Sequence, residues 1–521
     1  MTVHEPGAAR DLSWAVPGLA ELIQVQAAAA PHLGYLEAAS GSRRITFGEL
    51  RAVTRRWADL LEDLGVEVGE TVGIAVSEPV GFSLVFLSVI AAGRTAAPID
   101  PAATEGETVA VCSRTRPRLV VSDRPGPGDG PEWVTMPAGS FTLSEATSDW
   151  PGERVAPSLA GRDPARPTGG VVLSTSGTTG APKVIHLEQP ALLHAARAVA
   201  EHHGLAPGDR GFNPLPLFHI NAEVVGLLAT LVGGATLILD DRFHRHGFWD
   251  QLTRHGVTWI NAVPAILSRL GELRGGETVP DGIRFARSAS APLPLPVLER
   301  FEQATGIPVV ETYGMTEAAS QITANPVGGP RKAGSVGRPV GVEVRVGTGG
   351  TAPVMVGPVG IRGPSVIRSY ASPGYEDWVD ADGWLDTGDL GYLDEDGYLF
   401  LVGRADDVIN RGGEKIYPRE VEDVVLADAA VVAVAVVGSD HDVLGRVPVA
   451  YLVVDGVSGP TDRAEAEAVV ARVQDRCTAV LSRPKRPAAF YVVEALPQGA
   501  TGKVRRRAVS GDAAIYSLLV R

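Results

Sequence analysis

Hydrophobic and polar positions along the first two thirds of this chain predict helices that alternate with buried strands. Thr46 and Glu49 have the spacing of a capping box, and the amphipathic pattern behind them predicts a helix to about Leu64. The apolar run 72–76 then predicts a buried strand. The same order continues with helices near 190–203, 246–255 and 264–273 and strands near 171–173, 235–239 and 257–261. Strands separated by helices of this length predict a largely parallel sheet and an α/β fold.

The pattern changes twice further along the chain. Short β-like runs broken by Gly, Asp and Pro predict a small β-rich subdomain over about 333–404. Residues 407–521 predict a compact α+β unit, with a helix that opens at 418–422, a helix at 462–480, and strands at 431–437, 447–454 and 489–493. We therefore expect a large N-terminal domain over 1–404 and a small C-terminal domain over 407–521, with residues 123–170 mostly loop.

Composition narrows the class of protein. The chain has 521 residues, of which 45% are hydrophobic and 21% are charged, as expected for a globular protein. Its 47 Lys and Arg against 61 Asp and Glu give a net charge of −14, which argues against nucleic acid or an anionic membrane as the main partner.

The termini, cysteines and apolar runs indicate a cytoplasmic protein without a membrane span. The N-terminus lacks the pattern of a signal peptide. The most apolar stretch, 80–99, contains Arg94 and predicts a buried helix that leads into a strand. Cys112 and Cys477 have neither disulfide nor metal-ligand spacing, so we expect buried free thiols.

The segment 174–183, STSGTTGAPK, carries the clearest chemistry. It follows the predicted strand 171–173 and combines hydroxyl side chains, two glycines and a terminal lysine. Glycines allow backbone N–H groups to approach an anion, hydroxyls donate to phosphate oxygens, and lysine adds a positive charge. The segment therefore predicts a polyphosphate site, although it lacks the spacing of a Walker A loop.

Four further segments carry candidate functional groups: ETYGMTE (311–317), WLDTGDL (384–390), GRADDVI with RGGEK (403–415) and PQGATGK (497–503). Tyr313 could stack on a base, Thr316 could donate to a phosphate, and Glu317 could bind Mg²⁺. Asp389 could hold the two hydroxyls of a ribose. Taken singly, each residue has a structural explanation, such as core packing, a turn or a surface ion pair.

Together and in this order, the five segments resemble the signature blocks of the adenylate-forming (ANL) superfamily, which includes acyl-CoA synthetases, adenylation domains of peptide synthetases and luciferases. The resemblance spans about residues 20–510. It implies that a carboxylate attacks the α-phosphate of Mg·ATP to give an acyl-adenylate and pyrophosphate. A thiol, usually that of CoA, then displaces AMP. The expected cofactors and substrates are ATP, Mg²⁺ and CoA.

The resemblance also implies roles for individual residues. The β- and γ-phosphates would be held by Thr175, Ser176, Gly177, Thr178, Thr179 and Lys183. The adenine would be enclosed by Ser290, Ala291, Pro292 and Tyr313, within a nucleotide site that includes Glu311 and Thr312. Thr316 would contact the α-phosphate and Glu317 would bind Mg²⁺, while Asp389 would bind the ribose and Arg404 the ribose or a phosphate.

The small domain would act in both half-reactions. Lys503 would bridge the attacking carboxylate and the α-phosphate, since two anions must be neutralised and aligned. Asp406 matches the hinge of the superfamily, at residues 405–406. Rotation there would exchange the Lys503 face for the face with Gly412 and Gly413, on the thiol side.

The identity of the acid is harder to predict from the sequence. His219, in the segment 216–225, matches the residue that separates the acyl pocket from the thiol tunnel, and Asn221, Ala289 and Gly314 are further pocket candidates. The sequence of this region is similar to that of crotonobetaine/carnitine-type CoA ligases and other bacterial synthetases for small or functionalised acids. If Asn221 or Glu223 lines the pocket, the acid has a polar or cationic substituent; otherwise an aliphatic or aromatic acid fits.

Three functions remain open from the sequence. The first is an AMP-forming acyl-CoA synthetase, an acid–thiol ligase. The second is an adenylating enzyme that passes the acyl group to a carrier-protein thiol, an amine or a small nucleophile such as nitrite. The third is a non-catalytic nucleotide-binding relative, which would be expected to lack Lys503 or Glu317. A monomer and a homodimer are both compatible with the chain.

Overall fold

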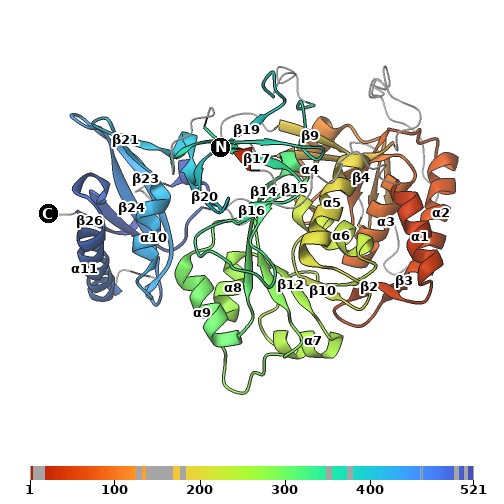
Figure 1. Ribbon diagram of the computed structural model, residues 1–521, viewed down its shortest axis with the longest axis horizontal. Coiled ribbons are helices and arrows are strands. Elements are labelled where there is room, and N and C mark those ends of the chain that lie inside the picture. Colours follow the sequence, from red (N-terminus) through yellow and green to blue (C-terminus); the bar gives the residue numbers. More distant parts are fainter. Residues whose placement is uncertain are drawn as a thin grey trace.

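The computed structural model describes residues 2–3, 18–124, 132–135, 168–175, 183–347, 355–371, 379–457, 459, 462–497, 504–509 and 514–519. Figure 1 shows a large body and a smaller C-terminal body, drawn in blue at the left. The mixed α/β architecture agrees with the fold class predicted from the sequence.

Two largely parallel sheets form the large body. The first has the strand order β7-β6-β4-β5-β8-β9, in which the β8–β9 pair alone is antiparallel among the described strands. Its strands are β4 (Thr71–Ala75), β5 (Thr95–Pro98), β6 (Leu119–Ser122), β7 (Glu132–Thr135), β8 (Gly170–Thr175) and β9 (Lys183–Glu188). The apolar stretch around Arg94 forms helix α3 (Pro79–Ala91) followed by β5, as predicted.

The second sheet has the order β16-β15-β14-β13-β12-β10-β11-β2-β3. Its strands are β2 (Gly34–Ala38), β3 (Arg44–Thr46), β10 (Arg210–Asn213), β11 (Thr236–Leu239), β12 (Trp259–Ala262), β13 (Phe285–Ser288), β14 (Val309–Met315), β15 (Ser320–Ala324) and β16 (Arg338–Pro339). The run from β14 to β2 is parallel, so the carboxyl ends of these strands meet at one edge. Such an edge is where open α/β sheets bind their ligands.

Helices cover and separate the two sheets. They are α1 (Leu19–Ala29), α2 (Phe47–Asp63), α3, α4 (Glu105–Thr115), α5 (Gln189–His203), the π-helix η1 (Ala222–Leu228), α6 (Ala229–Val232), α7 (Phe248–His255), α8 (Pro264–Leu270) and α9 (Leu295–Thr305). Helix α5 contacts β8 and β9 of the first sheet and β15 of the second, so it lies between them. The predicted capping box is present at α2, where Thr46 and Glu49 bond reciprocally.

A third sheet follows, in the order β1-β17-β18-β19-β20. Its strands are β1 (Thr2–Val3), β17 (Glu343–Val346), β18 (Gly357–Arg362), β19 (Leu385–Leu393) and β20 (Leu399–Arg404), and all their pairings are antiparallel. Four of its strands, β17 to β20, lie within the region expected to be β-rich.

The C-terminal body has its own sheet and its own buried cluster. After the 3₁₀ turn η3 (Ala405–Asp407) come β21 (Ile409–Arg411), β22 (Glu414–Ile416), α10 (Pro418–Leu426), β23 (Val431–His441), β24 (Gly445–Val454), α11 (Arg463–Val480), β25 (Ala489–Val493), the 3₁₀ turn η6 (Arg506–Ala508) and β26 (Ala514–Leu519). The main buried cluster ends at Leu399, and that of the smaller body begins at Ile409.

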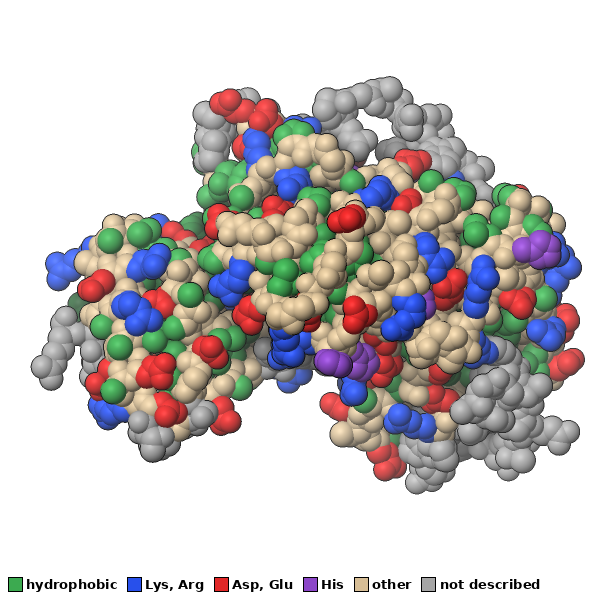
Figure 2. All heavy atoms as spheres, turned by 90° about the horizontal axis from the view of Figure 1, so that it is seen from below, with side chains coloured by type: hydrophobic (Ala, Val, Ile, Leu, Met, Phe, Trp, Pro, Cys, Tyr) green, Lys and Arg blue, Asp and Glu red, His purple; other side chains and the backbone are tan. Residues whose placement is uncertain are grey.

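Surface and core agree with the composition. Cys112 and Cys477 are buried and unbridged. On the described part of the face drawn in Figure 2, acidic and basic side chains are interspersed. No helix among the described residues combines the length and hydrophobicity that crossing a membrane requires.

Candidate active site

Three predicted nucleotide-binding side chains meet at the junction of two sheets. Tyr313, on β14, donates its hydroxyl to Asp389 Oδ2 on β19 at 2.5 Å. Arg404, the partner of Asp389 across β19 and β20, donates to Asp389 Oδ1 at 3.3 Å and to Thr387 O at 3.2 Å. Burial raises the pKa of Tyr313 well above its usual value, and Asp389 adds to this effect, so the phenol stays a neutral donor. The three side chains form one connected polar group.

A second cluster lies around Glu317, in the 3₁₀ turn η2 (Thr316–Ala318). Tyr370 donates its hydroxyl to Glu317 Oε1 at 2.9 Å, and Lys183 Nζ lies 4.6 Å from the centre of the Tyr370 ring. Burial lowers the pKa of Lys183, nearby Glu317 raises it, and nearby Arg404 lowers it. Lys183, Glu317 and Arg404 are therefore close enough to act on one another, although they are far apart in sequence.

The hairpin of β8 and β9 positions the predicted phosphate loop. Thr175 pairs with Lys183 at the end of this hairpin, so the loop begins and ends beside the Glu317 cluster. Before the loop, the hydroxyl of Ser174 accepts a hydrogen bond from Arg114 Nη1 of α4 at 2.6 Å. The loop residues Ser176, Gly177, Thr178 and Thr179 lie outside the described residues, as does the side chain of Thr175.

The predicted adenine segment follows β13 and lies beside β14. Ser288 pairs with Glu311, and Thr312 Oγ1 donates to Ser288 O at 3.0 Å, which brings Ser290, Ala291 and Pro292 next to the ETYGMTE strand. Ser290 has a positive φ of 71°.

Unusual backbone gathers at this site. Besides Ser290, Ala319 and Ser320 also have positive φ, and the described residues contain one further non-glycine residue of this kind, Arg116. Strained backbone of this sort persists where the surrounding structure fixes it, often at functional sites. Gly314 sits at a bulge between β14 and β15, where an added Cβ would stand 1.5 Å from Ser320 O. The close approach of the two strands requires glycine here.

The acyl-pocket candidates lie near a buried arginine, Arg287, to which the sequence analysis assigned no role. His219 is half-buried and packs on Phe218, and two residues later Asn221 Oδ1 accepts from Arg287 Nη1 at 2.8 Å. Ala289 follows Arg287 by two residues, and Gly314 pairs with Gln321, another hydrogen-bond partner of Arg287. The signal available in the sequence was a single charged residue, Arg287, in the otherwise uncharged run 285–289. Tyr370, the other residue missed, belongs to none of the quoted segments.

Glu223 behaves differently from Asn221. It is fully buried, and neither carboxylate oxygen has a hydrogen-bond partner among the described residues. Burial raises its pKa well above the usual value, which favours the uncharged form of the side chain.

The smaller body meets the large one through α10 and the segment that begins at residue 504. Burial raises the pKa of Glu311 to about 7, while Arg419 of α10 lowers it and Asp423 raises it. Thr104 lowers the pKa of Glu107, and Arg505 lowers it further, so Arg505 lies near α4. Lys503 itself lies outside the described residues.

The other predicted residues of the small body lie at its surface. Asp406 is exposed in η3. Gly412 and Gly413 form the exposed turn between β21 and β22, both with positive φ, and Figure 1 shows β21 on the side of the smaller body away from the large one.

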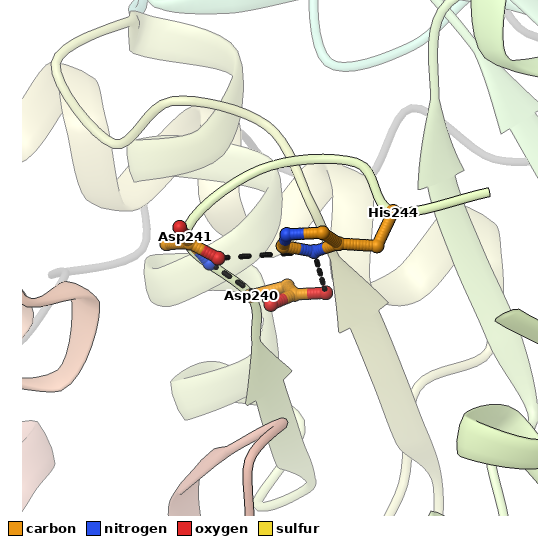
Figure 3. A group of neighbouring side chains, drawn as sticks. All are labelled: Asp240, Asp241 and His244. Carbon is orange, nitrogen blue, oxygen red and sulfur yellow. Dashed lines mark hydrogen bonds and ion pairs between the residues drawn. The ribbon is translucent and has the colours of Figure 1, made fainter. Parts of the chain in front are cut away.

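A separate group of titratable side chains follows β11. Asp240, Asp241 and His244 bring their ligand atoms within 4.8 Å of one another, as Figure 3 shows. His244 Nδ1 lies 3.2 Å from Asp240 Oδ2, and Arg242 donates to His244 Nε2 at 3.2 Å. Because Arg242 already brings a positive charge to this group, the arrangement is that of an ion-pair cluster.

The polar group around Asp389 and the Glu317 carboxylate near Lys183 fit an ATP-dependent enzyme of the acid-activating class. Family models agree: residues 23–371 match the AMP-binding enzyme family, and residues 420–503 match the AMP-binding enzyme C-terminal domain. The chain belongs to this family and is of the acyl-CoA synthetase type within the adenylate-forming superfamily.

Individual relatives extend over nearly the whole chain. The sulfoacetate–CoA ligase of Cupriavidus necator is 36% identical over 506 residues, which cover 94% of this chain and 96% of the relative. The oxalate–CoA ligase of Arabidopsis thaliana is 34% identical over 495 residues, 90% of this chain and 94% of the relative.

A solved relative shows the same fold with ligands. The o-succinylbenzoate CoA synthetase of Bacillus subtilis has a TM-score of 0.78 both with its acyl-adenylate intermediate and with ATP and magnesium ion. The two structures are 28% and 29% identical to this chain, cover 94% of it, and are themselves covered to 97% and 98%.

Proposed function

We propose that this enzyme activates a small or functionalised carboxylic acid with Mg·ATP and transfers the acyl group to CoA. The observation that carries the proposal is the convergence of Asp389, Arg404, Lys183 and Glu317 around one junction, from four separate segments of the chain. This set combines a ribose-binding carboxylate, two cations for phosphates and a ligand for a divalent ion.

In the first half-reaction a carboxylate oxygen of the acid bonds to the α-phosphorus of ATP. The bond from that phosphorus to the oxygen bridging to the β-phosphate breaks, and pyrophosphate leaves. Lys183 and the loop after β8 hold the leaving phosphates, and Thr316 donates to the α-phosphate. Lys503 aligns the two anions. Asp389 accepts from the ribose hydroxyls while Tyr313 and Arg404 fix its orientation.

Glu317 fits a magnesium site. Its half-buried carboxylate is oriented by Tyr370, and a single carboxylate beside phosphates is the usual environment of Mg²⁺ in ATP-dependent enzymes. When bound, the ion supplies charge neutralisation on the triphosphate. Glu317 would hold it and Tyr370 would keep Glu317 in place.

In the second half-reaction the CoA sulfur bonds to the acyl carbon, the carbon–oxygen bond to AMP breaks, and the thiol proton passes to solvent. We propose a hinge at residues 405–406 between a domain over 1–404 and one over 407–521. Rotation about exposed Asp406 brings Gly412 and Gly413 to the site, and His219 separates the acyl pocket from the thiol. The contacts of Arg505 and α10 with the large body fit the state that adenylates.

CoA is the proposed acceptor because the named relatives are CoA ligases. Their names specify small acids with a second acidic group, and from them we take a small functionalised acid as the substrate. A carrier-protein thiol is the second candidate acceptor. We propose a cytoplasmic location, where ATP and CoA are both supplied, and an enzyme that works as a monomer or homodimer.

Two variants separate the half-reactions. Lys503→Ala should abolish acid-dependent ATP–pyrophosphate exchange and still form acyl-CoA from a supplied acyl-adenylate. Asp406→Pro should exchange normally and fail to make the thioester. Normal exchange in Lys503→Ala would remove that lysine from the mechanism, and equal loss of both steps in Asp406→Pro would refute the hinge.

A further inference from the structure

One buried charge near the acyl pocket has no role in the reaction as described so far. Arg287 is the third residue of β13, at the carboxyl edge of the large sheet, and its side chain is 2% exposed. Its cross-strand neighbour on β12 is Asn261. Charged side chains are buried to this degree almost only when they are paired.

The partners of Arg287 are all neutral. Its Nη1 donates to Asn221 Oδ1 at 2.8 Å and to Asn261 Oδ1 at 3.3 Å, and its Nη2 donates to Gln321 Oε1 at 3.2 Å. No carboxylate of the described residues forms an ion pair with it under 4 Å, by contrast with Arg404 and Asp389. Three amide oxygens orient a guanidinium, but they leave its charge uncompensated.

Arg287 nevertheless keeps that charge. Burial lowers its pKa to about 9, which is still above neutral pH. The titratable groups that feel it are His202 and His203 at the end of α5, and both are themselves neutral: burial lowers the pKa of His202 to about 4, with Arg287 lowering it further, and that of His203 well below its usual value. The surroundings therefore supply no negative charge from the described residues.

The cluster also contains hydrogen-bond donors that have no acceptor among the described residues. Arg287 Nε, Asn221 Nδ2 and Gln321 Nε2 are buried without an acceptor among the described residues. Each amide turns its oxygen toward the guanidinium, so its NH₂ group is left for another partner. A guanidinium flanked by two amide donors matches the oxygens of a carboxylate or sulfonate.

This cluster is continuous with the expected acyl pocket. Asn221 follows His219 by two residues, Ala289 follows Arg287 by two, and Gln321 is the register partner of Gly314. Arg287, Asn221 and Gln321 therefore lie next to residues that the sequence predicts to line the acyl pocket.

We propose that the Arg287 cluster binds a second anionic group of the acid, so that the enzyme selects small acids with a carboxylate at one end and a carboxylate or sulfonate at the other. This proposal rests on the proposed acid-activating function and specifies its substrate class. The second anion remains unreacted. It pairs with Arg287, accepts from Asn221 and Gln321, and holds the first carboxylate toward the α-phosphate.

The test compares acids of equal chain length that carry at the far end a carboxylate, a sulfonate, a neutral amide or a trimethylammonium group. Pyrophosphate release is measured with each acid. The wild type should prefer the two doubly acidic compounds by about 10²-fold in kcat/KM, because a buried charged site left unpaired rejects a neutral or cationic analogue. The relative rates of the carboxylate and sulfonate arms identify which anion fits.

Arg287→Met should remove this preference, with the loss mainly in KM for the doubly acidic acids and little change for the neutral amide. Gln321→Met, which deletes one donor and keeps the charge, should lose about fivefold. Arg94→Met is the matched control. Arg94 is also buried, but all three of its nitrogens donate to the backbone oxygens of Val66 and Ala92. This control should leave acid selectivity unchanged.

Thermal shift gives a readout that does not need catalysis. The doubly acidic acid should raise the Tm of the wild type and of Gln321→Met, and should not raise that of Arg287→Met. A wild type that activates the neutral or trimethylammonium acid best, or an Arg287→Met variant that loses activity equally with every acid, would overturn the proposal while the acid-activating function stands. Absence of pyrophosphate release with every acid would instead refute that function.

Discussion

Tyr370 offers a direct test of how the predicted metal ligand is held. Its hydroxyl donates to Glu317 Oε1 at 2.9 Å, while its ring lies 4.6 Å below Lys183 Nζ. Tyr370→Phe removes the hydrogen bond and keeps the ring. Tyr370→Leu removes both contacts.

The expected size of the effect follows from these contacts. A hydrogen bond to a charged group contributes about 1.5–3 kcal/mol, and Glu317 is half-buried, so the lower end applies. A loss of about 1.5 kcal/mol corresponds to about a tenfold change. The cation–π contact of Lys183 at a partly exposed site adds about 0.5–1 kcal/mol, or about a threefold change.

The assay is acid-dependent ATP–pyrophosphate exchange over a range of Mg²⁺ concentrations. Tyr370→Phe should need about tenfold more Mg²⁺ for half-maximal exchange, and Tyr370→Leu should in addition raise the KM for ATP about threefold. Tyr491→Phe is the matched control, since Tyr491 stacks on Tyr451 in the C-terminal sheet. An unchanged Mg²⁺ requirement in Tyr370→Phe would refute the positioning of Glu317 by Tyr370.

Two further predictions concern the ETYGMTE strand. Burial raises the pKa of Glu311 from 4.5 to about 7, so the folded state keeps a proton that the unfolded state loses, and stability falls by about 3 kcal/mol as pH rises from 4.5 to 7. Denaturant titrations at pH 5 and pH 8 should show a smaller fall in the free energy of unfolding for Glu311→Gln than for the wild type. An equal fall in the two proteins would refute the assignment. Gly314→Ala should abolish exchange, because the new Cβ would stand 1.5 Å from Ser320 O, half the closest approach that real Cβ atoms make. Gly106→Ala, in open space on α4, should fold and exchange as the wild type does, and full activity in Gly314→Ala would contradict the tight bulge.

Much of the local structure could be predicted because neighbouring residues determine it. The capping box of α2 depends on Thr46 and Glu49, three residues apart, and it forms as expected. The strand expected at 489–493 is β25 with the same bounds. The apolar stretch that contains Arg94 forms a helix and then a strand, as expected. Both elements are buried, and this burial explains why the stretch contains so few polar residues.

The contacts of the site could not be read from the sequence in the same way. The hydrogen bond from Tyr313 to Asp389 joins residues 76 positions apart, and that from Arg287 to Asn221 joins residues 66 apart. The first joins strands of two different sheets, and the second joins β13 to the start of the π-helix η1. Tyr370 reaches Glu317 across 53 positions, and no local pattern marks it. The motifs indicated the reaction, whereas the residues around Arg287 that bear on the choice of acid needed the fold.

The central claim is that the acid is activated as an acyl-adenylate before transfer to CoA. It is tested most directly with an acid whose carboxylate is labelled with ¹⁸O, incubated with ATP, Mg²⁺ and CoA, and followed by mass spectrometry of the nucleotide product. Attack of the carboxylate on the α-phosphate predicts one ¹⁸O atom in each AMP, formed together with one acyl-CoA. Unlabelled AMP, or label in inorganic phosphate with ADP as the nucleotide, would contradict the account.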